Sequence, residues 1–174
     1  MSGNGTEDAG STGANLGEFG RIARYFRPLS SGFPGALDLV DDAALLDVPA
    51  DRELVVTMDA LVEGVHFLPG DPPADLAVKV LGVNVSDLAA MAADPYCYTL
   101  AIALPRERGD AWLAAFADGL ARAQRIFGIV LAGGDSVSTP GPLSLTVMAS
   151  GTVPRGRALK RGGGRAGDHV YVSG

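Results

Sequence analysis

The sequence is poor in cysteine, in basic residues and in long apolar runs. Cys97 is the only cysteine among 174 residues, which excludes a disulfide scaffold and a cysteine-based zinc site. Twenty acidic residues outnumber 14 basic ones, so nucleic-acid backbone and anionic lipid are not expected partners. No stretch approaches the roughly 20 apolar residues of a membrane span, and no basic start with an apolar run marks a secretory signal. These absences predict a cytoplasmic protein.

Apolar side chains make up 47% of the sequence, which excludes a wholly disordered chain. The length is that of one ordinary domain with its own core. Residues 1–14 are rich in Gly, Ser, Thr and Asn, and we expect a disordered tail there, followed by one domain at 15–174. The 24 glycines and 11 prolines predict many tight turns, or backbone that approaches a ligand closely.

Hydrophobic spacing predicts three helices and several short strands. Apolar residues at helical intervals follow a capping box formed by Asn15 and Glu18, and similar intervals follow the caps Asp71 and Asp110. Apolar and β-branched runs between the helices are typical of buried strands. This order predicts an α/β or α+β fold with helices on one face of a sheet. The predicted helices are 15–26, 71–93 and 110–127, and the predicted strands are 43–46, 54–58, 96–104, 129–132, 143–153 and 170–172.

Several common catalytic motifs are missing. The sequence has no phosphate-binding loop of the Gly-x-x-x-x-Gly-Lys-[Ser/Thr] type, no glycine-rich kinase loop and no Gly-x-Ser-x-Gly elbow. The two histidines, His66 and His169, are too far apart in the sequence to form a His-x-x-x-His metal pair. Cys97 falls within a predicted strand and is interpreted as a small core residue rather than a nucleophile. Carboxylates therefore remain as the groups that carry chemistry.

Five aspartates stand where apolar runs stop, at positions 41, 42, 59, 87 and 135. A carboxylate among apolar neighbours is costly to desolvate unless it is paired, and few basic residues flank these positions. A hard cation such as Mg²⁺ binds carboxylates from scattered segments and commonly bridges to phosphate. The alternative for each aspartate is a turn former or a helix cap. The adjacent like charges of Asp41 and Asp42, and the position of Asp87 within a predicted helix, favour the cation.

Several motifs, taken in order along the chain, are similar to those of thiamine-monophosphate kinases. They include Gly17-Glu18-Phe19, Asp41-Asp42-Ala43-Ala44, Thr57 to Phe67, Asn84-Val85-Ser86-Asp87, Gly133-Gly134-Asp135, and Gly156 to Leu159 with Arg161. From about Gly17 onward the chain resembles the N-terminal part of that family, within the aminoimidazole ribonucleotide synthetase-like superfamily. The resemblance implies a mixed sheet with helices on one face and a homodimer in which two such sheets pair. It also implies that the family's C-terminal domain is absent from this chain.

The resemblance further implies ATP-dependent phosphorylation of thiamine monophosphate to thiamine diphosphate with the help of several Mg²⁺ ions. By position, the metal ligands are Asp42, Thr57, Asp59, Asp87, Asp135 and the backbone of Met58, with Asp41 as a neighbouring helper. The implied ATP contacts are Gly134, Asp135 and Arg161, and the implied substrate contact is His66. The alternative for His66 is a histidine that only completes a turn, and the alternative for Arg161 is a solvated loop charge.

The acceptor in such a reaction is a phosphate monoester, whose second pKa of about 6 leaves its oxygen largely deprotonated at pH 7. No side chain is therefore assigned as a catalytic base. The difficulty is the repulsion between two polyanions, which clustered Mg²⁺ offsets. Two other functions stay open: another ATP-dependent enzyme of the same superfamily, and a non-catalytic module for nucleotide binding and dimerisation.

Overall fold

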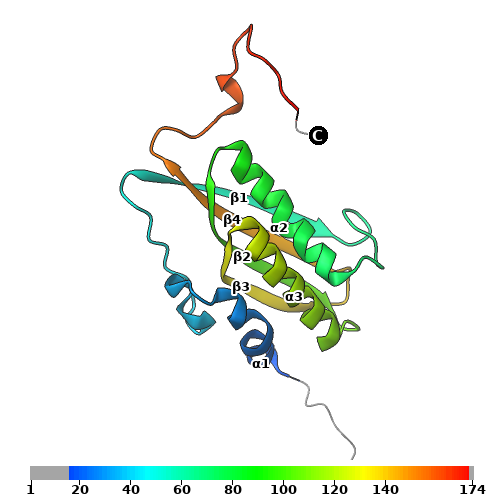
Figure 1. The fold of residues 1–174 in the computed structure, drawn as a ribbon. Coiled ribbons are helices and arrows are strands. Elements are labelled where there is room, and N and C mark those ends of the chain that lie inside the picture. The colour runs from blue at the N-terminus through cyan, green and yellow to red at the C-terminus, as the bar shows by residue number, and fades with distance from the viewer. Residues whose placement is uncertain (1–15, 173–174) are drawn as a thin grey trace, which may run out of the picture.

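The protein has two layers in a computed structural model that describes residues 16–172. Two long helices, α2 (Pro73–Ala90) and α3 (Asp110–Phe127), pack over one face of a four-stranded sheet (Figure 1). The expected fold class, a mixed sheet with helices on one face, is confirmed. The tail predicted at 1–14 and the capping residue predicted at Asn15 lie outside the described residues.

The sheet consists of β1 (Arg52–Val62), β2 (Asp94–Pro105), β3 (Val130–Thr139) and β4 (Ser144–Pro154), in the spatial order β1-β4-β2-β3. β4 is antiparallel to both of its neighbours, whereas β2 and β3 run parallel and are joined through α3. The edges of the sheet are therefore β1 and β3. A parallel pair needs a crossover connection, and the segment from 110 to 127 supplies it as a helix.

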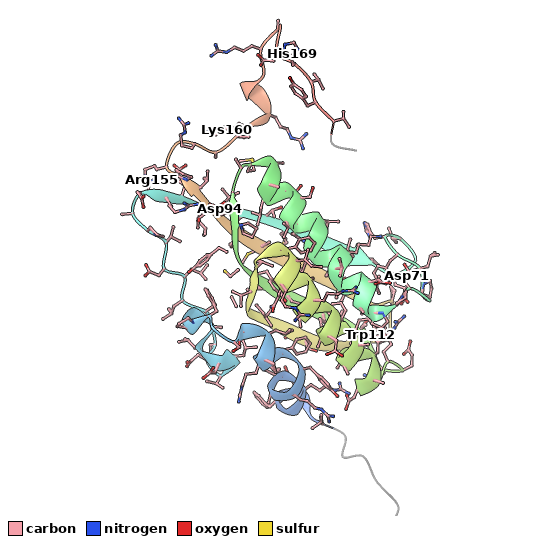
Figure 2. The ribbon with its side chains drawn as sticks, in the orientation of Figure 1. Asp71, Asp94, Trp112, Arg155, Lys160 and His169 are labelled. Atoms are coloured by element: carbon pink, nitrogen blue, oxygen red, sulfur yellow. The ribbon has the colours of Figure 1, made fainter. Side chains whose placement is uncertain are left out.

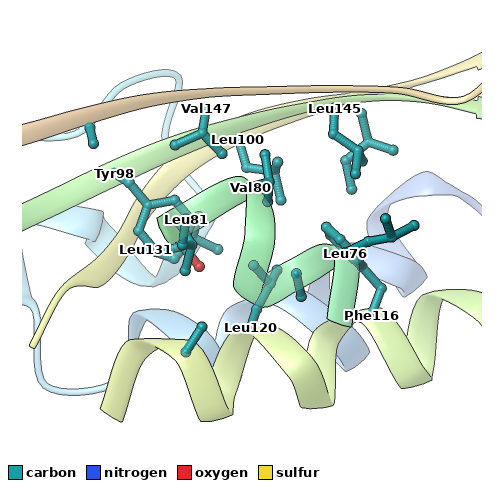
Figure 3. Close-up of a cluster of buried hydrophobic side chains, with 14 of the residues drawn as sticks. Leu76, Val80, Leu81, Tyr98, Leu100, Phe116, Leu120, Leu131, Leu145 and Val147 are labelled. Carbon is teal, nitrogen blue, oxygen red and sulfur yellow. The ribbon is translucent and has the colours of Figure 1, made fainter. Parts of the chain in front are cut away.

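One hydrophobic core lies between the sheet and the two helices (Figure 3). Leu145 and Val147 of β4 alternate with less buried residues and are fully buried beneath the helices. Leu81 of α2 and Phe116 of α3 point into the same core. The two helices approach each other so closely that a Cβ atom on Gly119 would lie 2.5 Å from Cα of Ala74.

The other face of the sheet is open and partly apolar. Even-numbered residues of β1 point to it, and Leu54, Val56 and Met58 are 40%, 53% and 67% exposed. Val137 of β3 shares that face through the strand register and is 50% exposed. The long helices lie on the opposite side (Figure 1), so these apolar side chains remain accessible to solvent.

The first predicted helix is broken into shorter turns. The chain forms α1 (Glu18–Arg21), a π-helical turn η1 (Ile22–Phe26) and a 3-10 turn η2 (Arg27–Ser30), followed by the 3-10 segment η3 (Pro34–Leu39). Proline in η2 lacks the N–H group that a continuing α-helix would need. These turns pack beside β3 and α3, at the edge of the sheet opposite to β1.

The two long helices begin without the predicted aspartate caps. Pro72 and Gly109 occupy the N-cap positions, and neither helix has a side-chain cap. Asp71 instead accepts a hydrogen bond from the N–H of Leu68 at 3.0 Å, and Asp110 forms an ion pair with Arg21 at 2.9 Å. The capping prediction was wrong because Asp71 binds the N–H of Leu68 within its own loop and Asp110 pairs with the distant Arg21.

Two predicted strands do not form, and another is longer than predicted. Residues 43–46 lie in a loop where the N–H of Leu45 donates to the carbonyl of Gly35 at 2.8 Å. Residues 170–172 follow the 3-10 turn η4 (Arg161–Gly163) as an irregular segment, 87–92% exposed, with no neighbouring strand in the described part of the chain. β3 continues through Gly133-Gly134-Asp135 to Thr139 instead of ending there. Local sequence favours extended backbone, but a strand also needs a partner.

No helix in residues 16–172 combines the length and the apolar character needed to cross a membrane.

Candidate functional site

Two candidate cation ligands meet where β1 lies against α2. Oγ1 of Thr57 donates a hydrogen bond to Oδ2 of Asp87 at 3.0 Å. The register pairs Thr57 with the fully buried Ala149, so Thr57 lies on the helix side of the sheet. Asp59 is two positions further along β1 and therefore faces the same side. Oxygen donors from a strand and a helix thus line one edge of the protein, which we call the β1–α2 edge, defined by Thr57, Asp59 and Asp87.

Asp87 lies on the flank of α2 rather than in its buried stripe. Leu88 and Asn84 are fully buried, whereas the carboxylate of Asp87 is exposed beside β1. Nδ2 of Asn84 donates to the carbonyl of Val80 at 3.0 Å, and its buried Oδ1 has no hydrogen-bond partner in the described part of the chain. Asp87 is therefore neither a helix cap nor a core residue. Asn84, one turn earlier in α2, has a buried side-chain oxygen without a hydrogen-bond partner in the described residues.

The remaining metal candidates of the first half of the chain differ in position. Met58 presents its side chain to the open face, but its backbone, the predicted ligand, lies in β1 between Thr57 and Asp59. Asp41 and Asp42 are exposed in the loop between η3 and β1, and no hydrogen bond or ion pair of their side chains occurs within residues 16–172. The structure therefore does not bring Asp42 into contact with the β1–α2 edge.

Asp135 is on the opposite face of the sheet from the β1–α2 edge. The register pairs Asp135 with Ala101, Ala101 with Thr146, and Thr146 with Ala60. Ala60 points to the open face, so Asp135 points there too. β3 and β1 are separated by three strand spacings, roughly 14 Å. Within one chain, a single ion cannot contact both Asp59 and Asp135.

The two other ATP candidates have different surroundings. A Cβ atom on Gly134 would lie 2.0 Å from the carbonyl oxygen of Leu100, so the close approach of β3 to β2 already requires glycine there. Arg161 is exposed in η4, in the segment that leads away from the sheet and helices (Figure 1). Neither residue lies at the β1–α2 edge.

The donor chemistry of the β1–α2 edge suits Mg²⁺, which prefers oxygen ligands and retains several waters. Yet residues 16–172 contain no group of three His, Cys, Asp or Glu side chains arranged to hold a metal ion. Thr57, Asp59 and Asp87 place two carboxylates and one hydroxyl on the same side of the sheet, which is fewer than the three such side chains that a metal cluster needs.

His66 occupies a tight turn directly after β1. Its N–H donates to the carbonyl of Val62 at 2.8 Å, and its Nδ1 accepts from the N–H of Val62 at 3.1 Å. Gly64 adopts a φ of 77° within this turn, a conformation that favours glycine. The other histidine, His169, lies in the C-terminal segment well away from the sheet (Figure 2). His66 is thus an ordered, exposed imidazole at one end of β1.

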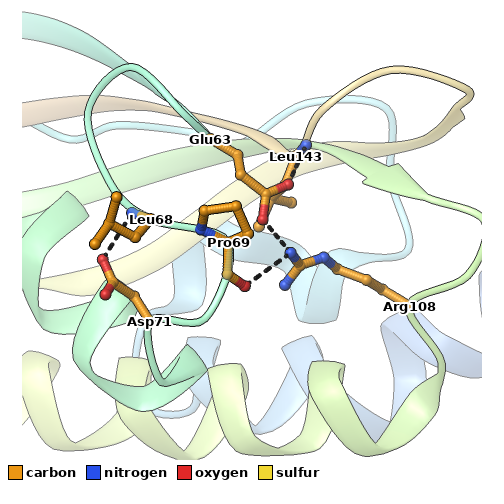
Figure 4. Close-up of polar contacts among 6 residues, drawn as sticks. All are labelled: Glu63, Leu68, Pro69, Asp71, Arg108 and Leu143. Carbon is orange, nitrogen blue, oxygen red and sulfur yellow. Dashed lines mark hydrogen bonds and ion pairs between the residues drawn. The ribbon is translucent and has the colours of Figure 1, made fainter.

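Sequence reasoning missed a partly buried ion pair beside this turn. Glu63 pairs with Arg108, and their side chains are only 11% and 17% exposed (Figure 4). Lys79 of α2 also donates to the carbonyl of His66. Glu63 lies within one of the stretches that resemble the family. However, Arg108 is 45 residues away from Glu63 in the sequence, and nothing local signals that pairing.

Thr57, Asp59 and Asp87 do not themselves line either of two surface cavities in the described part of the chain. A cavity of about 700 Å³ opens at the start of β1, between Met91, Arg155 and Ala158, and Arg52, which pairs with Asp94, also lines it. A second, of about 410 Å³, lies between α1 and the ends of β2 and β3. The first cavity borders the β1–α2 edge, because Val55 and Val56 of β1 and Met91 directly after α2 line it.

The only cysteine carries no sign of reactivity. Cys97 is 2% exposed, and burial raises the pKa of its thiol to about 11. A thiol that stays protonated at neutral pH is a poor nucleophile and a poor metal ligand. This agrees with its interpretation as a core residue.

Comparison with known proteins identifies the family. Residues 40–153 match the model of the AIR synthase related protein, N-terminal domain. The chain belongs to this family. The match includes all four strands except the last residue of β4, as well as α2 and α3, and it confirms the resemblance found in the sequence motifs.

Individual relatives carry a more specific name. The chain is 50% identical to the thiamine-monophosphate kinase of Salmonella typhimurium over 159 residues, which cover 91% of this chain and 48% of that protein. It is 47% identical to the thiamine-monophosphate kinase of Caulobacter vibrioides, over 90% of this chain and 45% of that protein. The chain therefore spans about half the length of the relatives that it matches.

Solved structures agree with this relationship. The crystal structure of thiamine-monophosphate kinase from Stenotrophomonas maltophilia matches with a TM-score of 0.65 and 49% identity, over 70% of this chain and 38% of that one. A structure of AaThiL complexed with AMPPCP and TMP matches with a TM-score of 0.63 and 30% identity, over 86% of this chain and 46% of that one. The fold of the N-terminal family domain is thus shared with known kinases.

Proposed function

We propose that this chain is the N-terminal, ATP- and Mg²⁺-binding part of an enzyme that phosphorylates thiamine monophosphate to thiamine diphosphate. The observation that carries the proposal is the hydrogen-bonded pair of Thr57 and Asp87 next to Asp59, on a domain about half identical to thiamine-monophosphate kinases. The complex of AaThiL with AMPPCP and TMP supports ATP and thiamine monophosphate as the two substrates.

In the proposed reaction, an oxygen of the acceptor phosphate forms a bond to the γ-phosphorus of ATP. The bond from that phosphorus to the bridging oxygen breaks, and ADP leaves with the electron pair. The acceptor oxygen needs no base, because a phosphate monoester is largely dianionic at neutral pH. This agrees with the carboxylates and hydroxyl of the β1–α2 edge, which bind cations and do not abstract protons.

Thr57, Asp59 and Asp87 would hold Mg²⁺ at the β1–α2 edge. Asp42 and Asp135 remain proposed ligands that must act from another part of the assembly. Bound Mg²⁺ would supply positive charge that offsets the repulsion between the two substrates and supports the loose transition state. Gly134 and Arg161 are proposed to contact ATP, and His66 to contact the phosphorylated substrate. The backbone of Met58 is proposed as a further ligand.

The open face of the sheet supports a homodimer as the working assembly. Leu54, Val56 and Met58 expose apolar surface there, and an apolar sheet face gains free energy when a second copy covers it. Asp135 lies on the same face, so pairing of two sheets would place it in an interface. The proposed compartment is the cytoplasm, in keeping with the single buried thiol.

A second candidate function is a nucleotide-binding and dimerisation module without turnover of its own. It is favoured by the absence of a cluster of three metal-binding side chains within residues 16–172. Another ATP-dependent reaction on the same fold is the remaining alternative, because fold alone does not select a substrate.

The test measures thiamine diphosphate formed from thiamine monophosphate, ATP and Mg²⁺. The two proteins compared are this chain and a chimera in which it replaces the matching part of the Salmonella typhimurium kinase. We expect turnover by the chimera and loss of turnover with Asp59→Asn, whereas Asp118→Asn on the outer side of α3 serves as the matched control. Turnover that survives Asp59→Asn contradicts the cation assignment. A chimera that binds ATP with Mg²⁺ but gives no product supports the module.

A further inference from the structure

The turn that carries His66 is held at both of its ends by one arginine (Figure 4). Arg108 precedes α3, and its Nη2 contacts the carboxylate of Glu63 and donates to the carbonyl of Pro69 at 3.4 Å. The other carboxylate oxygen of Glu63 accepts from the N–H of Leu143 at 3.3 Å. The segment from 63 to 69 is therefore anchored to the start of α3 and to the chain just before β4.

Burial makes this ion pair different from the other pairs of the protein. The Glu63 and Arg108 side chains are 11% and 17% exposed, whereas those of Asp75 and Arg122 are 68% and 50% exposed. The guanidinium also lies 5.5 Å from the ring centre of Trp112, within the range of a cation–π contact. A desolvated pair is costly unless its geometry and hydrogen bonds are complete, and here each partner has a second acceptor or donor.

The turn fixes not only the position of His66 but also its protonation pattern. β1 is an edge strand, so the N–H of Val62 that points away from β4 is free to donate to Nδ1 of His66. An Nδ1 atom that accepts a hydrogen bond carries no proton, and the neutral imidazole must then hold its proton on Nε2. The carbonyl of His66 is in turn held by Lys79. The Nε2–H group is left as the free donor of an exposed side chain.

We propose that Glu63 and Arg108 are positioning residues that hold the turn from 64 to 67 so that His66 presents Nε2–H to an anionic oxygen of a phosphate monoester. Only the identity of that ligand rests on the proposed function. If the Glu63–Arg108 ion pair only sealed the hydrophobic core beside the turn, its loss would lower the stability of the protein without changing the tautomer of His66. If it positions His66, its loss changes the tautomer and the exchange of the turn amides in a protein that remains folded.

The experiment uses ¹⁵N-histidine labelling of this chain, whose only histidines are His66 and His169, with His169→Gln for assignment. The variants are Arg108→Lys, which keeps the charge but loses the planar fork, and Glu63→Gln, which keeps the shape but loses the charge. Arg122→Lys is the matched control, because it alters an exposed ion pair of the same type. Spectra of all variants are recorded in the same alkaline buffer.

In the parent chain we expect the Nε2–H tautomer of His66 and slow hydrogen exchange of the amides of Gly64 and His66. Arg108→Lys and Glu63→Gln should mix the tautomers and accelerate exchange of these amides by roughly tenfold or more, whereas Arg122→Lys should leave both unchanged. A single Nε2–H tautomer with slow exchange in both folded variants would overturn the positioning role.

The anion is tested with inorganic phosphate and with thiamine monophosphate, in the absence of ATP and Mg²⁺. We expect either ligand to shift the ¹⁵N signal of His66 Nε2 in the parent chain. The variants Arg108→Lys and Glu63→Gln should bind both ligands with lower affinity. No shift in the parent chain overturns the presentation of Nε2–H to phosphate. Because neither readout involves phosphoryl transfer, failure here is distinguishable from failure of the proposed kinase activity.

Discussion

The helices α2 and α3 have equal length and cover the same face of the sheet, yet only α2 carries candidate chemistry. Both contain 18 residues, and both contribute a stripe of fully buried side chains to the core. α2 lies over the edge strand β1, so its flank brings Asp87 to Thr57 and Lys79 to the turn of His66. α3 lies against α2 and the N-terminal turns.

The difference shows that position at a sheet edge decides which helix can form a site. An interior strand has neighbours on both sides, whereas β1 leaves donors and acceptors free on one side. The backbone N–H of Val62 uses this freedom to donate to His66, whereas Thr57 reaches Asp87 through its side-chain hydroxyl. α3 serves mainly the packing of the domain, and its variants should therefore change stability rather than binding.

The largest stability effect is expected from truncation of the core stripe of α3. Leu120→Ala removes a fully buried side chain and leaves a cavity, so the free energy of unfolding should fall by about 2–5 kcal/mol. Urea unfolding followed by circular dichroism measures the change. Ile126→Ala on the exposed side of the same helix should cost less than about 0.5 kcal/mol. Equal losses at the two positions would mean that α3 is not packed as described.

A smaller loss is expected where the two helices touch. Gly119→Ala places a methyl group 2.5 Å from Cα of Ala74 and 2.8 Å from Cβ of Ala77, so the helices must separate. We expect about 1–3 kcal/mol of destabilisation from this overpacking. Thermal unfolding of Gly119→Ala and of Gly82→Ala provides the comparison, because a Cβ on Gly82 meets only ordinary contacts with Phe127. If the Gly119→Ala variant is as stable as the parent chain, the close contact between the two helices is contradicted.

The smallest effects concern the ends of the two helices, and they should have opposite signs. Both helices are followed by a left-handed residue, Ala92 with φ 57° after α2 and Gly128 with φ 65° after α3. Glycine adopts this conformation without the steric cost that alanine carries. Ala92→Gly should therefore stabilise the protein and Gly128→Ala should destabilise it, each by about 1 kcal/mol. A shift of the melting temperature in the same direction for both variants would refute this explanation.

Much of the fold could be predicted from the sequence because its long elements carry strong periodic patterns. The helices at 73–90 and 110–127 and the strand ending at Pro154 lie close to the predicted ranges. The predicted strands at 43–46 and 170–172 were wrong, since their apolar runs find no strand partner in residues 16–172. Within the predicted range 15–26 the helix changes from α to π at Ile22, which the apolar spacing does not reveal, and Pro28 lies beyond that range.

The candidate site could be predicted in part. Asp87 was expected to be functional because aspartate is unfavourable within a helix, and the structure gives it a partner in Thr57. The ligands predicted for one magnesium cluster are divided between two faces of the sheet, because strand register, which sequence spacing does not reveal, places Asp59 and Asp135 on opposite sides. Arg108 was missed because its pairing with Glu63 is set only by the tertiary fold.

The most direct test of the β1–α2 edge compares one aspartate on each helix. Calorimetric titration of this chain with Mg²⁺ and ATP is carried out for Asp87→Asn on α2 and for Asp118→Asn on α3. Both residues are exposed, so both variants should unfold at nearly the same urea concentration as the parent chain. We predict that Asp87→Asn weakens Mg²⁺-dependent ATP binding by roughly tenfold or more, while Asp118→Asn leaves it unchanged. Equal affinities for the two variants would contradict a cation site at the β1–α2 edge.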